Sequence, residues 1–382
     1  MTFSFGDITR KLGSAFGGSG EGSFLGVDIG ASSAKIVQLR ASRGSAILET
    51  YGEIALGPYG NQPIGKAVKL QPEKTAEALI DLMKEANVTA HEAGISISFS
   101  SSLVSILELP KTDKESLKRI IPIEARKYIP IPVSEVQLDW FVIPEESEEE
   151  SAFDRVTKQS NHPHGLEVLL IAIHNETIRN YQTIASVAGL KPEFYEIEIF
   201  STVRSSVGHG IAPILVVDLG AAATKMYVIE RGVIRLTHLI TVGGQHITET
   251  FARSLNWEFE KAERVKRERG LNDSSAYSVE ENERIKTALL STLTRVFSEV
   301  NRVVLSYGQR YNKNISHVIF SGGGASLPGL ASAAKTYLNA DVEIADPFAR
   351  TEAPAFLEQV LREIGPGFAV SVGLVLRKLK QS

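Results

Sequence analysis

Residues 25–35 read LGVDIGASSAK, an apolar run that leads into the pattern Asp-x-Gly-x-x-x-x-Lys. The same pattern returns in residues 216–225, VVDLGAAATK, half a chain-length further on. In both copies the Lys opens a β-rich run, an Arg-Gly pair predicts a turn, and another β-rich run follows, over 46–54 and 233–242. This internal repeat predicts that each half of the chain opens with a three-stranded meander of the same design.

The rest of the sequence alternates between strand and helix periodicity, which predicts a layered α/β fold. Outside the meanders, strands are predicted over 93–99, 104–109, 136–143, 166–174 and 317–320. Helices are predicted over 73–86, 113–128, 177–188, 197–207, 258–269, 280–312, 328–338 and 367–378. In the second of these helices, Asp113 is a predicted N-cap, and Pro122 is expected to kink or interrupt the helix.

The strands and helix between 100 and 174 differ in pattern from both meanders, and they predict a small α+β insert within the first half. An acidic, polar loop is expected between 145 and 165. The Gly/Ser-rich start predicts a flexible tail, with a short amphipathic docking segment as the alternative. The expected division is a tail at 1–22, a first half at 23–99 and 166–212, an insert at 100–165 and a second half at 213–382.

The composition of the chain narrows the classes of function. Of its 382 residues, 43% are hydrophobic and 23% are charged, which is the balance of a soluble globular protein. A net charge of −4 argues against broad binding to nucleic acid, which needs a concentrated basic surface. The absence of cysteine excludes disulfides, thiol catalysis and Cys-based zinc sites. No apolar run reaches the ~18 residues of a membrane helix, and no signal-peptide pattern is present.

The repeated loops are the first candidate site. Asp28 and Asp218 end apolar strands, where a carboxylate needs a cation or hydrogen-bond donors. The backbone amides of 30–33 and 220–223 are predicted to donate to phosphates, and hard carboxylate oxygens suit Mg²⁺, through water. Two ordinary hairpin turns are the alternative interpretation. Because the two motifs stand at the same point of a repeated meander, a phosphate clamp is the preferred one.

Two further motifs complete the candidate site. Residues 321–329 read SGGGASLPG, and a strand that runs into glycines ahead of a helix predicts a close contact with a nucleoside. Glu263 and Lys266 stand three residues apart on one helix face. Their spacing alone predicts no more than a surface ion pair.

The chain resembles the actin-like ATPase superfamily that includes actin, FtsA and sugar kinases, and within it the PilM family of the type IV pilus assembly platform. The resemblance extends over about residues 24–377 and includes both meanders, AERVK at 262–266 and SGGGASLPG. It also includes IEARKYIP at 123–130, LDW at 138–140 and GPGFAVSVGL at 365–374. It implies an actin-like ATPase fold in which two ribonuclease-H-like halves flank a nucleotide, with the insert as the subdomain called 1C in FtsA.

The resemblance also implies roles for individual residues toward ATP or ADP and Mg²⁺. Asp28 and Asp218 would stand near Mg²⁺, and Glu263 and Lys266 would contact the ribose and adenine. The remaining positions would bind the phosphates or the adenosine: Gly30, Ser32, Ser33 and Lys35 in the first loop, Gly220 and Thr224 in the second, and Gly322, Gly323 and Gly324 in the glycine cluster. The second loop is poorer in glycine than in many relatives, and no residue stands out to orient an attacking water, so slow hydrolysis or none is expected.

For partners, the resemblance implies the cytoplasmic N-terminal peptide of a PilN-like membrane protein, held in a groove between the insert and the first half. That peptide would tether a cytoplasmic protein to the inner membrane, while homo-oligomer formation stays open. Three other functions remain as alternatives: an FtsA-like division protein, a small-molecule kinase of the same superfamily, and a scaffold that has lost nucleotide binding.

Overall fold

The computed structural model describes residues 22–42, 44–144, 165–208 and 210–381. The predicted tail at 1–22, apart from its last residue, and the acidic loop up to 164 lie outside these residues. The described chain forms two compact units. One, the small unit, spans 99–179, and the other, the large unit, comprises 22–98 and 180–381.

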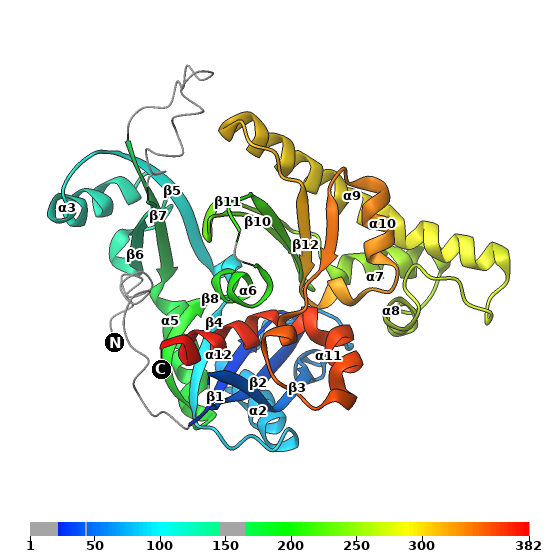
Figure 1. Cartoon of the computed structure of the whole chain (residues 1–382). Coiled ribbons are helices and arrows are strands. Elements are labelled where there is room, and N and C mark those ends of the chain that lie inside the picture. Colours follow the sequence, from blue (N-terminus) through cyan, green and yellow to red (C-terminus); the bar gives the residue numbers. More distant parts are fainter. Residues whose placement is uncertain (1–21, 43, 145–164, 209, 382) are drawn as a thin grey trace. The chain divides into compact units, whose positions relative to one another are not determined.

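The large unit contains two five-stranded sheets of the same topology, β3-β2-β1-β4-β8 and β11-β10-β9-β12-β13 (Figure 1). In each sheet the meander strands are antiparallel, and the two strands that follow are parallel to its first strand. The first sheet comprises β1 (Ser23–Ile29), β2 (Ser33–Ser42), β3 (Ser45–Ala55), β4 (Glu92–Ile97) and β8 (Lys191–Ile197). The second comprises β9 (Ile214–Leu219), β10 (Thr224–Glu230), β11 (Val233–Ile240), β12 (His317–Ser321) and β13 (Asp341–Ile344).

The two meanders also agree in register. Asp28 pairs with Lys35 across β1 and β2, and Asp218 pairs with Lys225 across β9 and β10. Each copy has a register shift three residues after its Lys, one between Gln38 and Leu39 and the other between Val228 and Ile229. The repeat predicted from sequence is therefore present strand by strand, whereas edge strands β8 and β13 were not predicted.

The helices of the large unit pack on these sheets or on one another. They are α2 (Pro72–Glu85), α6 (Glu198–Ser206), α7 (Gly244–Leu255), α8 (Phe259–Glu268), α9 (Val279–Tyr311), α10 (Leu330–Tyr337), α11 (Glu358–Ile364) and α12 (Ala369–Gln381), and α5 (Asn175–Val187) joins the small unit to the large one. Short 3-10 turns used below are η1 (Gly57–Gly60), η4 (Gly323–Ser326), η5 (Pro347–Arg350) and η7 (Gly365–Phe368). Helix α7 has no counterpart among the predicted helices.

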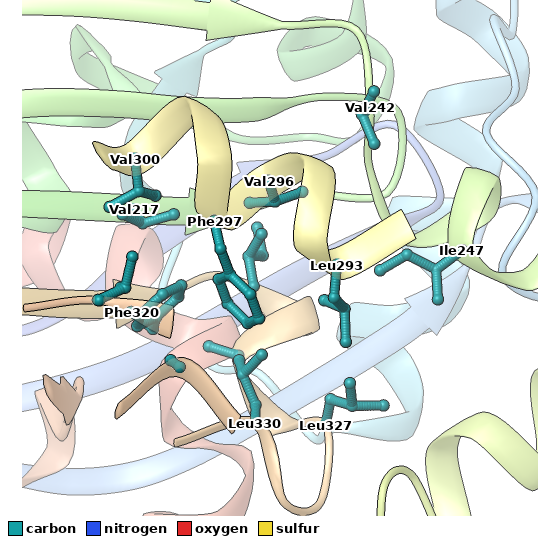
Figure 2. Packing of buried hydrophobic residues seen from close by; sticks show 14 of the residues in the cluster. Val217, Val242, Ile247, Leu293, Val296, Phe297, Val300, Phe320, Leu327 and Leu330 are labelled. Carbon is teal, nitrogen blue, oxygen red and sulfur yellow. The ribbon is translucent and has the colours of Figure 1, made fainter. Parts of the chain in front are cut away.

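The core of the second half lies between its sheet and the long helix α9. Figure 2 shows side chains of α9 directed at Val217 and Phe320 of the sheet. Phe297 makes an edge-to-face contact with Phe320, with ring centroids 6.4 Å apart. Burying a side chain of this size stabilises the fold by about 1.5–3 kcal/mol. The helix predicted over 280–312 thus forms because its apolar stripe has a sheet to cover.

The final helix, α12, packs on the first sheet, although it follows the second in sequence. Helix α12 lies against β1 and α6 (Figure 1). Small residues allow this close approach: a Cβ on Gly26 would lie 2.1 Å from the carbonyl oxygen of Ser371, and one on Gly373 would lie 1.9 Å from that of Ser201. The expected division kept 213–382 together as the second half, but backbone contacts of this kind place α12 with the first.

A buried ion cluster fixes α12 in this position. The carboxylate of Glu196 accepts hydrogen bonds from Arg204 of α6, at 2.7 and 2.8 Å, and from Arg377 of α12, at 2.8 Å. The helical stretch Ala355–Leu379 has the length and apolar composition of a membrane span, but 67% of its apolar 18-residue segment is buried inside the structure. Buried core helices commonly have these properties, and the packing of α12 accounts for its composition.

The small unit is a three-stranded sheet, β5-β7-β6, covered by one helix. Its elements are β5 (Ser102–Pro110), α3 (Lys114–Ala125), β6 (Val136–Val142) and β7 (Gly165–His174). Asp113 caps α3 as predicted, accepting from the backbone of Glu115 and Ser116, and Pro122 does not interrupt the helix. The expected division placed 166–174 in the first half, but β7 pairs with both β5 and β6 and so belongs to this sheet.

Candidate functional site

The two Asp-x-Gly loops have the same local geometry. Gly30 donates its backbone N–H to Ser33 at 3.0 Å, and Gly220 donates to Ala223 at 3.1 Å. A Cβ on Gly30 would lie 3.0 Å from the Ser33 oxygen, and one on Gly220 would lie 2.9 Å from the Ala223 oxygen. Glycine is therefore needed in both turns for the same steric reason, and it brings the backbone close to the end of the preceding strand.

Asp28 and Asp218 stand at the ends of β1 and β9, each beside a different donor. Asp28 accepts a hydrogen bond from the Ser96 hydroxyl at 2.7 Å, and Asp218 accepts from Lys225 Nζ at 2.9 Å. Burial, and then the charge of Glu198, raises the pKa of Asp28 from 3.8 to about 6. Asp28 thus gives up its proton less readily than an ordinary aspartate, as expected for a carboxylate placed among others.

Glu198, the first residue of α6, brings the two loops into one charged cluster. Its Oε2 lies 2.6 Å from Lys225 Nζ, and the same ammonium group pairs with Asp218. Burial lowers the pKa of Lys225, but the charges of Asp218 and Glu198 outweigh it and hold this pKa above its usual value. The structure therefore brings a carboxylate of the first half and the acidic loop of the second half onto one ammonium group.

Glu198 is the functional candidate that the sequence analysis missed. It follows strand β8, which was not predicted, and its neighbour Glu196 forms the buried ion cluster with α12. The sequence does place a carboxylate at the junction of a strand and a helix, and this could have marked Glu198 as a candidate. Only the sheet topology shows which way this carboxylate faces.

Three other residues predicted to bind the phosphates, Lys35, Ser32 and Thr224, each make different contacts. Lys35 Nζ lies 2.6 Å from Ser33 Oγ and 2.9 Å from Glu53 Oε1, so its charge is directed along β2 and β3. Ser32 uses its carbonyl to accept from Leu56 N at 2.9 Å. Thr224 is fully buried and donates its hydroxyl to the Val242 carbonyl at 2.6 Å. The Thr224 hydroxyl is therefore engaged by the segment that leads into α7.

The glycine cluster packs directly against the second acidic loop. Gly322 has a φ of +82°, and a Cβ there would lie 2.3 Å from Asp218 Oδ1. A Cβ on Gly324 would lie 2.8 Å from the Cβ of Leu219, whereas one on Gly323 would meet nothing within 4 Å. Gly322 and Gly324 are thus required by packing, whereas the position that a Cβ on Gly323 would take is open.

Glu263 and Lys266 form a buried pair, whereas their spacing alone predicts a surface pair. Their charged atoms lie 2.6 Å apart, and only 4% of Glu263 is exposed. Lys266 also donates to Thr248 Oγ1 at 2.7 Å and to the Gly244 carbonyl at 3.1 Å, both on α7. Burial opposes ionisation of Glu263, but the Lys266 charge and hydrogen bonds from Lys266, Thr248 and Arg267 hold its pKa below its usual value.

This pair is connected to the second acidic loop through the start of α7. Gly244 donates its N–H to the Gly220 carbonyl at 2.9 Å, and its own carbonyl accepts from Lys266. The acidic loops, the glycine cluster and the Glu263–Lys266 pair are therefore linked by direct contacts within the large unit.

The donor set fits a divalent cation held mainly by water and by a bound anion. Among the described residues, no group of three or more His, Cys, Asp or Glu side chains is placed to hold a metal. Asp28 and Asp218 supply hard oxygen ligands of the kind that Mg²⁺ prefers, and Mg²⁺ usually keeps several waters.

Residues 26–379 match the family model described as type IV pilus assembly protein PilM. The chain belongs to the PilM family. A solved structure described as the PilM-PilN type IV pilus biogenesis complex superimposes with a TM-score of 0.75 at 24% identity, covering 94% of this chain and 99% of that chain. This PilM-family chain has the fold of the actin-like ATPases.

Other likenesses agree with this fold. The ethanolamine utilization protein EutJ from Carboxydothermus hydrogenoformans has a TM-score of 0.52 at 16% identity, covering 93% of this chain and 89% of that one. MreB5 of Spiroplasma citri, in a structure bound to ADP, has a TM-score of 0.50 at 11% identity, covering 94% and 97%. Cell division protein FtsA of Rhizobium meliloti (strain 1021) is 26% identical over 235 residues, 56% of this chain and 51% of that protein. This PilM-family chain therefore spans about half the length of the curated relatives it matches.

Proposed function

We propose that this chain binds ATP or ADP with Mg²⁺ between its two halves, as a component of the cytoplasmic side of a type IV pilus or related inner-membrane platform. The observation that supports the proposal is the matched pair of acidic loops, together with the ion pairs by which Asp218 and the first-half residue Glu198 meet on Lys225 Nζ. Two copies of one glycine turn beside such a charged cluster are suited to clamp a triphosphate.

Each part of the site has a distinct task in this proposal. The turns at Gly30 and Gly220 let backbone N–H groups approach the phosphates, while Asp28 and Asp218 hold water molecules around the cation. A bound Mg²⁺ would supply positive charge against the phosphate oxygens. Glu263 and Lys266 bind the nucleoside, together with the backbone of Gly323.

Glu198 is the candidate for orienting a water molecule in slow hydrolysis. Phosphoryl transfer needs a residue that positions the nucleophile, and a carboxylate beside the phosphate loops satisfies that requirement. Its Oε2 is engaged by the ion pair with Lys225, so we expect slow turnover or none. This ion pair also disfavours the small-molecule kinase alternative, which needs a carboxylate base for the substrate hydroxyl.

The second part of the proposal is a peptide partner. The superimposed structure is a PilM–PilN complex. We infer that this chain binds the cytoplasmic N-terminal peptide of a PilN-like membrane protein and is tethered to the inner membrane through it. An FtsA-like role is the alternative, since FtsA relatives match 56% of the chain.

Isothermal titration calorimetry of the wild type and of Asp28→Ala tests the nucleotide site. We expect the wild type to bind Mg-ATP and Asp28→Ala to lose binding while keeping a cooperative unfolding transition. Asp341→Ala, at an exposed position on β13, is the matched control and should bind normally. No heat with the wild type at about 1 mM ATP would favour the scaffold alternative.

The partner is tested by thermal unfolding with a synthetic peptide of the PilN-like N-terminus. A rise in melting temperature is expected because a ligand that binds only the folded state stabilises it. A scrambled peptide is the control, and sedimentation with liposomes separates the alternatives. Strong membrane binding without the peptide would favour the FtsA-like role.

A further inference from the structure

The segment between β3 and α2, residues 56–71, is attached to the first acidic loop at both ends. We name this segment the strap. Leu56 N donates to the Ser32 carbonyl, and Val68 N donates to the Ala31 carbonyl, each at 2.9 Å. The strap therefore leaves and rejoins the first half at the predicted phosphate loop, so a shift of that loop is passed directly to the strap.

The far side of the strap is held by α7 of the second half. Lys66 Nζ lies 2.5 Å from Glu249 Oε1, and Ala67 N donates to Gln245 Oε1 at 2.9 Å. Both acceptors lie on one face of α7, one helical turn apart. The Lys66 ammonium also stands 4.9 Å from the ring centroid of Phe259, at the start of α8. The strap thus spans from the first acidic loop to the helices that form the Glu263–Lys266 pair.

Between these contacts, the strap covers Glu263. Gly65 has a φ of +91°, and a Cβ on it would lie 2.6 Å from the carboxyl carbon of Glu263. Only a residue without a side chain fits at this distance and with this backbone conformation. With Gly65 above it and Lys266 and Arg267 beside it, the Glu263 carboxylate is almost fully buried.

We propose that the strap is a gate that controls how fast a nucleotide enters and leaves. This inference rests on the proposed function, which assigns Glu263 to the nucleoside. A ribose reaches the Glu263 carboxylate only when Gly65 moves away, and this requires release of Lys66 from Glu249 and of Ala67 from Gln245. The side chains of Lys66 and Glu249 are 31% and 32% exposed, so solvent screens their ion pair and the gate opens without a large barrier.

Point variants test the gate through exchange kinetics. Dissociation of radiolabelled ATP is measured by a chase with unlabelled ATP and rapid filtration. Lys66→Ala and Glu249→Ala are each expected to speed dissociation by about two- to fivefold, the effect of losing a partly exposed ion pair. Lys74→Ala removes an exposed ion pair of α2 and is the control, with no change expected. Unchanged rates in both gate variants would contradict the proposal.

A crosslink provides the stronger test, because the chain contains no cysteine. The double variant Lys66→Cys/Glu249→Cys is joined by a short bismaleimide either before or after loading with Mg-ATP. Joining before loading should slow association, and joining after loading should slow dissociation, each by at least about tenfold relative to the unjoined protein. The control Lys74→Cys/Glu77→Cys, joined within α2, should exchange normally.

The outcomes separate the gate from the proposed function. Equal exchange rates in the joined and unjoined Lys66→Cys/Glu249→Cys protein would overturn the gate and leave the nucleotide site standing. An absence of nucleotide binding by the unmodified protein would overturn the proposed function, and the gate with it.

Discussion

Lys225 Nζ lies 2.6 Å from Glu198 Oε2, and this ion pair joins the second half of the chain to the first. The same ammonium group pairs with Asp218, so one lysine neutralises carboxylates from both sides of the site. In the ligand-free protein this charge stands where the proposed function requires phosphates and a cation. Binding would therefore rearrange existing charges, and variants of these residues should affect stability as well as affinity.

Replacement of Lys225 by the uncharged Met is expected to destabilise the ligand-free protein. Asp218 and Glu198 would remain buried without their shared cation, and breaking a buried pair in this way costs about 3–5 kcal/mol. Urea unfolding measures the loss, with the exposed Lys74→Met as control. A loss of stability no greater than that of the control would show that Lys225 is not essential to the charge balance of the site.

Asp28→Asn is expected to stabilise the ligand-free protein above about pH 6. The folded-state pKa of Asp28 is raised, from 3.8 to about 6, so the folded protein binds the proton more tightly than the unfolded chain does. The unfavourable contribution of Asp28 therefore grows as pH rises from about 4 to 6 and is complete above that range. A shift of this size corresponds to about 1–3 kcal/mol.

Urea unfolding of the wild type and Asp28→Asn at about pH 4 and pH 8 measures this difference. The gain in the free energy of unfolding should be present at the higher pH and vanish at the lower one. Asp341→Asn, which changes an exposed carboxylate, is the control and should show little pH-dependent difference. A gain that is the same at both pH values would rule out titration of Asp28 as its source.

Arg377→Ala should loosen α12 from the first half. Arg377 donates to the buried Glu196 at 2.8 Å and stacks over the Phe194 ring at 4.3 Å, while Arg204 keeps Glu196 partly paired. We expect a loss of about 2–3 kcal/mol and faster hydrogen exchange in α12. The adjacent Lys378→Ala removes a more exposed ion pair with Glu193 and should cost at most about 1 kcal/mol. Similar losses for the two variants would contradict this assignment.

Phe297→Ala tests the core of the second half. Phe297 is buried between α9 and Phe320, and removing its ring should cost about 3–5 kcal/mol in the free energy of unfolding. Leu305→Ala, on an exposed position of the same helix, should cost far less. Comparable destabilisation by the two variants would indicate that α9 does not pack on the sheet through Phe297.

Local patterns in the sequence were sufficient to predict the elements that repeat or alternate regularly. Both meanders, the N-cap at Asp113 and the long helix α9 follow from strand alternation, capping chemistry and helical periodicity. Helix α7 was missed because it begins at Gly244, directly after the N-cap Gly243, and a pair of glycines favours a turn over a helix start. Since Thr248 and Gly244 of α7 accept hydrogen bonds from Lys266, the burial of the Glu263–Lys266 pair could not be predicted either.

The features that were not predicted depend on contacts between segments that are distant in sequence. Glu198 approaches Lys225 only because two sheets are assembled next to each other. The orientation of the Thr224 side chain depends on its hydrogen bond to the Val242 carbonyl. The packing of α12 on the first sheet was not predicted, because the small residues that allow it, Gly26 and Gly373, lie at opposite ends of the sequence. No local pattern records which surface such a helix will cover.

The position of α12 has a consequence for biosynthesis. Strands β1 and β2 leave the ribosome long before Val372 and Val375, which cover them. During translation, the apolar face of the first sheet must therefore wait until the sheet and helices of the second half have been synthesised before its own helix arrives. Any nascent chain that stalls earlier exposes that face to chaperones and proteases.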